Sequence, residues 1–332
     1  MPEARRQRIR TIAGIAISLL IGSLALWVLY RTFQHIRFVD VLERMRATPL
    51  DNLLLAAGCA AGAFTVLALY EWAVVRYVKG EVGRAKPIVT ALIAFPLGHA
   101  IGQAMLSGGA IRYRMYSPAG FSAMEVGATV LMCNLAYGLA VGLLLDVSLV
   151  LAADRLAPLF RLSAEWLVVL GCIGLAKDFG YMLLVAFRRA PVRIRGWSFK
   201  LPTPAMTALQ YVVGVADVLL VSSVLYLLLP DSVQLAYLPF LAVYLASVLV
   251  GIVSHVPAGL GVIESVMLVL LPDVPPEQLL ASVLMYRVIF EIIPLLFAVA
   301  LWGSFETFAL DGARLRLMRP RIRRDQEQEP RG

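Results

Sequence analysis

Charged residues are scarce in this chain. Only 16% of its 332 residues are Asp, Glu, Lys or Arg, whereas soluble domains contain about 25%. Hydrophobic residues make up 60% of the sequence. This balance excludes a water-soluble globular protein, because most of these side chains need an apolar surrounding. The sequence therefore predicts an integral membrane protein.

Cysteine and histidine are rare as well, with three residues of each. All three cysteines lie inside apolar runs, where a free thiol behaves as a small hydrophobe: Cys59, Cys133 and Cys172. The histidines are scattered and have no carboxylate at ligand spacing. No glycine-rich stretch ends in the G-K-[ST] of a nucleotide-binding loop. We therefore expect no disulfide, metal or other cofactor, no catalytic residue and no ATP-driven transport.

Basic residues flank the apolar runs, and this explains the net charge of +8 without nucleic acid as a partner. If all eight apolar segments cross the membrane, the inner loops hold 17 Lys and Arg residues and the outer loops hold 11. If residues 87–120 and 232–273 are re-entrant hairpins, the first entering from inside and the second from outside, the counts become 22 and 6. The positive-inside rule favours the hairpins.

The sequence thus predicts an all-α polytopic protein with two oppositely inserted re-entrant hairpins and both termini in the cytoplasm. Each full span has about the 20 apolar residues that a bilayer requires. The six spans lie near residues 11–30, 51–72, 125–147, 164–187, 205–229 and 279–302.

Two distant segments carry the same short pattern, in which a glycine-broken apolar stretch precedes a helix containing A-[ST]-V-L-M. The helix motifs are Ala128–Met132 and Ala281–Met285. The predicted hairpin breaks are Gly108 and Gly109 in the first segment and Pro257, Gly259 and Gly261 in the second. Paired interrupted segments in two halves of a membrane protein point to a midplane binding site. We therefore expect an inverted repeat with both breaks facing inward.

The chain divides into three parts. Residues 1–10 form a basic cytoplasmic N-terminus, residues 11–305 the transmembrane domain, and residues 306–332 a basic, partly disordered cytoplasmic tail. Residues 34–48 alternate apolar and charged side chains at helical spacing, which predicts an interfacial helix between the first two spans.

Several ionisable residues lie inside the predicted membrane segments. A charge at bilayer depth costs at least about 2.5–3.5 kcal/mol on insertion scales, which makes each one a candidate for a substrate path. Arg287 and Glu291 are four residues apart and can pair on one helix face. Asp217 is isolated and needs a cation, for which Lys177, Arg287 or Arg112 are available. The full set is Lys177, Asp178, Asp217, Glu264, Arg287 and Glu291.

Arg112, Tyr113 and Arg114 follow the first pair of glycines. A guanidinium grips phosphate through two parallel hydrogen bonds, and glycines let the backbone approach a ligand, so a phosphate-headgroup site is one interpretation. The other is a basic anchor beside a turn. Glu264 would lie in the first turn of the helix after the second break, where the helix dipole favours an acid. It could therefore be a cap or a partner for a cationic group or a proton.

Two blocks of sequence carry a family resemblance. S-G-G-A-x-R-Y-R-x-Y-x-x-x-G at 107–120 and P-A-G-L-G-V-x-E at 257–264 resemble the flippase-like membrane domain of lysylphosphatidylglycerol synthase/flippase. They are closer still to stand-alone inner-membrane proteins that carry this domain alone. The resemblance covers residues 10–305, and Arg112, Arg114 and Glu264 match positions in its motifs. It implies movement of a lipid between leaflets.

The synthesising relatives carry a large soluble C-terminal domain, whereas this chain ends in an arginine-rich tail. We therefore expect no lipid aminoacylation. The leading hypothesis is a translocase for a phosphate-containing lipid in the bacterial inner membrane, with an anionic-headgroup lipid as its partner. The alternatives are a scaffold for a separate soluble enzyme, a membrane enzyme that modifies lipid headgroups, and exchange of an ion or small solute. A homo-oligomer is compatible with each.

Overall fold

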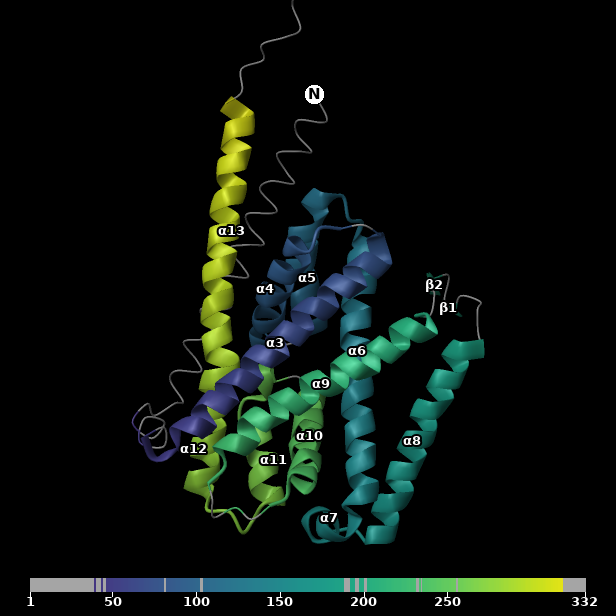
Figure 1. Cartoon of the computed structure of the whole chain (residues 1–332), viewed down its shortest axis with the longest axis vertical. Helices are drawn as coiled ribbons and strands as arrows, with labels where there is room; N and C mark the ends of the chain where they lie inside the picture. The colour runs from purple at the N-terminus through teal and green to yellow at the C-terminus, as the bar shows by residue number, and fades with distance from the viewer. Residues whose placement is uncertain are drawn as a thin grey trace, which may run out of the picture.

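The described part of the chain is almost entirely α-helical in a computed structural model (Figure 1). It comprises residues 46–80, 82–101, 104–187, 192–194, 197–199, 202–230, 235–254 and 256–318, with the single positions 39, 43 and 233. The predicted span at 11–30, most of the interfacial helix at 34–48, His255 and the tail beyond 318 lie outside it.

Six described helices are long and apolar enough to cross a membrane. Five of the six predicted spans are confirmed among them, and the protein is an all-α polytopic membrane protein. The sixth helix, Tyr237–Ser254, falls within the predicted second hairpin. The six are Leu50–Lys79, Ala123–Leu151, Ala164–Phe187, Pro204–Leu228, Tyr237–Ser254 and Pro276–Glu306.

One end of the molecule is defined by where α3 (Leu50–Lys79) stops and α6 (Ala123–Leu151) begins. Lys79 forms an ion pair with Glu125 at 2.8 Å. The sequence starts α6 here because Ser122 and Glu125 form a capping box, in which each side chain accepts the other's backbone N–H. We call this the basic end, because the described residues on either side of the first hairpin, which the charge pattern assigned to the cytoplasm, lie there.

The first hairpin enters from the basic end. Its arms are α4 (Ala85–Ile101) and α5 (Ala104–Tyr116), and they pack against each other in the upper half of Figure 1. The Ser107 hydroxyl donates to the Gly98 carbonyl at 3.1 Å, which places the two arms antiparallel close to their tip. The short helix η1 (Ser117–Ala119) then leads into α6.

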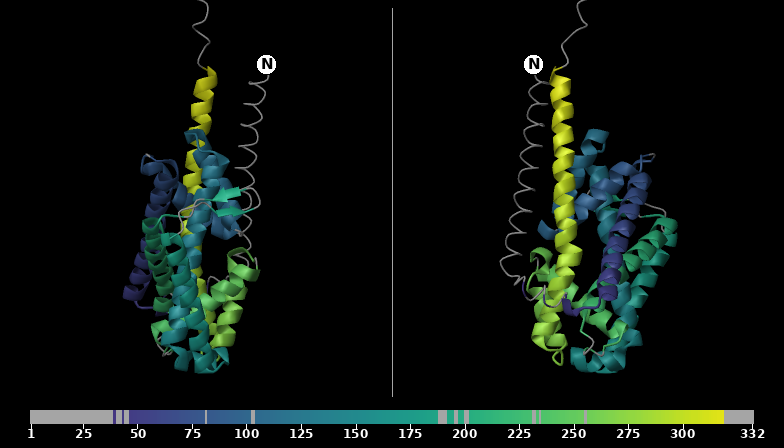
Figure 2. Two further views of the ribbon diagram at one scale, coloured as in Figure 1. Left: turned by 90° about the vertical axis from the view of Figure 1, so that its right-hand side faces the viewer. Right: turned by 60° about the vertical axis from the view of Figure 1, so that its left-hand side comes forward.

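The second hairpin enters from the opposite end, in the lower half of Figure 1. Its arms are α10 (Tyr237–Ser254) and α11 (Val262–Leu270), joined through the 3-10 turn η2 (Pro257–Gly259). α4 contacts η2, so the two hairpins meet inside the molecule. The chain then leaves through α12 (Pro276–Tyr286), the π-helical turn η3 (Arg287–Ile292) and α13 (Ile293–Met318) back to the basic end, as Figure 2 also shows.

The remaining elements complete the bundle. α9 packs against α3 and α6, and α8 lies along α6 at the edge of the bundle (Figure 1). Their bounds are α7 Ala153–Phe160, α8 Ala164–Phe187, α9 Pro204–Leu228, and a two-stranded antiparallel ribbon of β1 Val192–Ile194 and β2 Trp197–Phe199.

The short sequence repeat falls at corresponding places in the two units. α6 follows the first hairpin and α12 follows the second, and the two helices run in opposite directions (Figure 1). Thr129 and Ser282 are both fully buried, and the hydroxyl of each donates at 3.0 Å to the carbonyl four residues earlier, Glu125 and Gln278 respectively. The predicted inverted arrangement of the two units is therefore present in the fold.

The predicted break at Gly108 and Gly109 is wrong. Both glycines lie inside α5, which begins at Ala104, after α4 ends at Ile101. A side chain at Gly108 would approach the Ala94 carbonyl to 3.5 Å, and one at Gly109 would meet Val130 at 3.6 Å. Small residues let membrane helices approach closely. These glycines therefore lie within a helix, Gly108 facing α4 and Gly109 facing α6, and do not break the chain.

The predicted break at the second hairpin is confirmed. Ala258, Gly259 and Gly261 all have positive φ angles, at 51°, 59° and 79°. Glycine tolerates this region without a steric penalty, which explains two of the three residues. The arms are unequal, because α10 has 18 residues and α11 has nine.

Gly214 sets the distance between α9 and α6. A Cβ at this position would overlap the Ala136 carbonyl, which is backbone and cannot move aside. We expect Gly214→Ala to destabilise the protein by about 1–3 kcal/mol through overpacking. Thermal unfolding of the detergent-solubilised protein measures this as a lower midpoint. Gly127→Ala in α6 is the control, because open space surrounds it and Ala favours a helix; equal midpoints for both variants would contradict the tight contact.

Candidate functional site

Arg287 lies where the second hairpin meets the helix that follows it. It is 1% exposed and starts the π-helical turn η3, a local distortion common at functional sites. Its Nε donates to Glu264 Oε1 at 2.6 Å and its Nη1 donates to Glu291 Oε2 at 2.9 Å. The predicted pairing of Arg287 with Glu291 is confirmed. A buried guanidinium is tolerated here because two carboxylates neutralise it.

The same guanidinium also holds the break itself. Arg287 Nη1 donates to the Ala258 carbonyl at 3.1 Å, and Nη2 donates to the Gly259 carbonyl at 3.4 Å. Left-handed backbone exposes carbonyl groups that no helix satisfies, and such groups inside a membrane need a donor. Arg287 therefore fixes the turn between α10 and α11.

The first hairpin reaches this cluster through His99 near the tip of α4. His99 Nε2 lies 3.8 Å from Glu291 Oε1, and the histidine side chain is 54% exposed. Glu264 Oε2 is buried and has no hydrogen-bond partner among the described residues. We call His99, Glu264, Arg287 and Glu291 the central charge cluster. It joins both hairpins and leaves one imidazole and one carboxylate oxygen available for a further contact.

Aromatic rings line one flank of the central charge cluster. Phe290 stacks between Tyr286 and Phe64, with ring centroids 5.7 Å and 5.3 Å apart. The hydroxyls of Tyr286 and Tyr244 lie 3.1 Å from each other. Aromatic residues with a polar tip provide both apolar and hydrogen-bonding surface.

Arg112 has a different environment from the predicted one. It is 2% exposed, and its Nε and Nη2 donate to the two carboxylate oxygens of Glu71 in α3, with Nη2 to Oε2 at 2.8 Å. The guanidinium also stacks on Phe95 and donates to the Gly108 carbonyl at 3.3 Å. The Tyr116 hydroxyl donates to the same carboxylate at 2.9 Å. This α3–α5 clamp leaves Arg112 no open position for a phosphate in the described conformation.

Sequence reasoning missed Glu71. It lies inside the predicted span 51–72 but at the edge of its apolar run, so it looked like a flanking charge. Its 0% exposure shows otherwise. A signal was available, because a carboxylate within a span needs a cation and the predicted first hairpin, which follows this span, supplies Arg112.

Arg114 and Tyr113 lie nearer the surface. Arg114 Nη2 pairs with Glu306 Oε2 of α13 at 2.8 Å, and Tyr113 is 47% exposed. The neighbouring arginines of the predicted phosphate site therefore face different partners. Arg112 binds α3, and Arg114 joins the hairpin to α13.

Lys177 and Asp178 belong to a second charge cluster, on the outer side of the bundle. Lys177 Nζ lies 3.6 Å from Asp146 in α6 and 3.5 Å from Asp178. Asp178 accepts from the Tyr211 hydroxyl at 3.2 Å. Asp146 was also missed, for the same reason as Glu71. Across the described residues, no group of three or more His, Cys, Asp or Glu side chains could hold a metal ion.

Asp217 does not have the predicted cation. The three cations proposed for it pair with other acids, and Asp217 Oδ1 is buried without a hydrogen-bond partner among the described residues. Buried carboxyls without a cation are commonly neutral.

Comparison with known proteins gives the same assignment over most of the chain. The family described as lysylphosphatidylglycerol synthase TM region matches residues 12–298. An uncharacterized protein of Synechocystis, slr0712, is 30% identical over 90% of this chain and 94% of its own length. The inner membrane protein YbhN of Escherichia coli is 25% identical over 77% of this chain and 81% of its own.

A third relative is larger than this chain. A phosphatidylglycerol lysyltransferase of Staphylococcus haemolyticus is 20% identical over 92% of this chain but only 35% of its own length. The shared part is thus the membrane region that the family profile describes. This multi-pass membrane protein belongs to the lysylphosphatidylglycerol synthase transmembrane-region family.

Proposed function

We propose that the protein is a lipid translocase that moves a phosphate-containing lipid headgroup between the leaflets of the bacterial inner membrane. The observation that carries the proposal is the central charge cluster, where the contact between two opposed hairpins holds Arg287, Glu264 and Glu291 inside the bundle. Charges at this depth are costly and are retained where a polar group must pass. Opposed broken segments are the arrangement that transporters use for such a site.

The chemistry of the cluster suits a headgroup that carries both signs of charge. The planar guanidinium of Arg287 donates to two carboxylates, and it can release one of them and bind a phosphate in its place. Glu264 Oε2 accepts no hydrogen bond from the described residues, so it can accept one from an ammonium group. Because acyl chains can remain in the bilayer, only the headgroup would cross this region.

His99 gives the sharpest test of this function because it is exposed, so its replacement should leave the fold intact. We expect His99→Leu to slow lipid movement by about tenfold to a hundredfold, as lost polar contacts to a charged headgroup are worth about 1.5–3 kcal/mol. Movement is measured in liposomes containing the purified protein, as the loss of headgroup-labelled phosphatidylglycerol from the outer leaflet.

The matched control is Thr65→Leu, which also replaces an exposed polar residue in a membrane helix but lies on α3. It should move lipid at the wild-type rate. Equal rates for protein-containing and protein-free liposomes, across phosphatidylglycerol, phosphatidylethanolamine and isoprenoid phosphate, would refute the proposed function. The orientation with both termini in the cytoplasm is part of the same proposal.

A further inference from the structure

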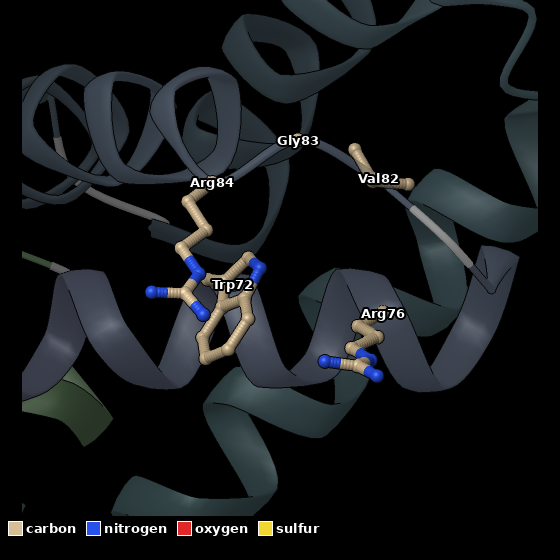
Figure 3. Close-up of a pocket in the computed structure, with 5 residues that line it drawn as sticks. All are labelled: Trp72, Arg76, Val82, Gly83 and Arg84. Carbon is tan, nitrogen blue, oxygen red and sulfur yellow. The ribbon is translucent and has the colours of Figure 1, made fainter.

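A pocket at the basic end lies outside the central charge cluster. It forms where α3 ends and the loop to α4 begins, has a volume of about 390 Å³, and is lined by Trp72, Arg76, Val82, Gly83 and Arg84 (Figure 3). We call it the Trp72 pocket. Its volume lies within the range of small-molecule sites.

Two guanidinium groups flank one indole in this pocket. The Arg84 guanidinium carbon lies 5.0 Å from the Trp72 ring centre and that of Arg76 lies 5.9 Å away. Figure 3 shows Arg84 reaching over the ring from the loop, while Arg76 lies one turn further along α3. Stacking on an aromatic face orients a guanidinium without occupying its hydrogen-bond donors.

The positive charge of the pocket is not neutralised by the described residues. Among them, neither Arg76 nor Arg84 has an ion pair, whereas nearby Lys79 pairs with Glu125 and Arg112 pairs with Glu71. No acid is among the described residues that line the pocket. Trp72 Nε1 is also buried without a hydrogen-bond partner among the described residues. A group with several acceptor oxygens and a negative charge would satisfy all three side chains.

The position of the pocket along α3 identifies the source of that group. Leu69, Trp72 and Arg76 are spaced three and four residues apart, so they share one helix face, and Leu69 is 51% exposed. Along this face an apolar residue is followed by an interfacial Trp and then by a cation. Phospholipids present acyl chain, glycerol and phosphate in the same order, and Trp prefers the level between them.

We infer that the Trp72 pocket binds the phosphate of an anionic phospholipid in the leaflet at the basic end. The arginines form charge-assisted hydrogen bonds to the phosphate oxygens, and the acyl chains lie against the exposed face of α3. This site holds a lipid at the surface of the bundle, and its existence does not depend on whether the protein moves lipids.

Native mass spectrometry of the full-length protein in detergent tests this site without any transport. The probes are phosphatidylglycerol, phosphatidylcholine and inorganic phosphate, each titrated separately. We expect the protein to bind phosphatidylglycerol more tightly than phosphatidylcholine or inorganic phosphate. The double variant Arg76→Lys/Arg84→Lys should weaken the binding of phosphatidylglycerol about tenfold, because lysine keeps the charge but loses the stacked planar guanidinium. Arg155→Lys/Arg161→Lys, at and just after α7, is the matched control and should bind as wild type does.

Two results would overturn the assignment. If both double variants bind phosphatidylglycerol equally well, attraction to the lipid is a general effect of surface charge. If inorganic phosphate displaces bound phosphatidylglycerol at equal concentration, the pocket is a site for a soluble anion. If His99→Leu moves lipid at the wild-type rate in liposomes, the proposed function is contradicted, but the binding of phosphatidylglycerol and its displacement by phosphate are unaffected. The two proposals are therefore tested separately.

Discussion

Replacing Arg287 with Met should abolish lipid movement and strongly destabilise the protein. The change leaves the carboxylates of Glu264 and Glu291 buried without their cation and removes the donor for the Ala258 and Gly259 carbonyls. Removing one partner of a buried ion pair costs about 3–5 kcal/mol. We expect a lower thermal unfolding midpoint and no protein-dependent loss of labelled lipid from the outer leaflet.

A triple variant separates folding from transport at this site. Arg287→Met, Glu264→Gln and Glu291→Gln together remove all three charges, and neutral or apolar replacements of a buried ion-pair network are often tolerated. The triple variant should regain the part of the unfolding midpoint that the two uncompensated carboxylates cost, although the Ala258 and Gly259 carbonyls still lack their donor, and it should remain inactive. If it moves lipids at the wild-type rate, the central charge cluster supports the fold only, and the proposed path must lie elsewhere.

The two hairpins and the Arg287–Glu291 ion pair could be predicted, because membrane insertion and helix geometry impose simple rules on sequence. The bias of Lys and Arg placed hairpins at 87–120 and 232–273, and the fold has opposed hairpins at both places. The pairing of Arg287 with Glu291 followed from helical spacing alone. Both inferences depend on local sequence or on counting, and neither requires knowledge of how the helices pack.

Partners on different helices could not be predicted in the same way. Glu71 and Asp146 lie at the edges of apolar runs, where a charge that reaches water and a charge that faces the bundle look alike in sequence. Gly108 was ambiguous for a related reason, because glycine permits both a break and a close helix contact. Only the antiparallel packing of α4 on α5 selects the second role.

Arg112→Met is the second change with a large expected effect, and it concerns stability. Glu71 would be left without its cation at 0% exposure, and among the described residues the Tyr116 hydroxyl and the Cys133 thiol would still donate to it. We expect a loss of about 3–5 kcal/mol, seen as a much lower unfolding midpoint or as failure to accumulate in the membrane. Loss of lipid movement in this single variant would therefore say nothing about phosphate binding.

The double variant Arg112→Met/Glu71→Met resolves this ambiguity. Two apolar side chains of similar length can fill the space between α3 and α5, and replacing a buried pair in this way is often neutral or stabilising. Because the α3–α5 clamp holds the first hairpin in place without an open position for a ligand, the double variant should fold and move lipid at close to the wild-type rate. A double variant that is stable but inactive would instead show that Arg112 leaves Glu71 during transport and binds the headgroup, as the sequence motif first suggested.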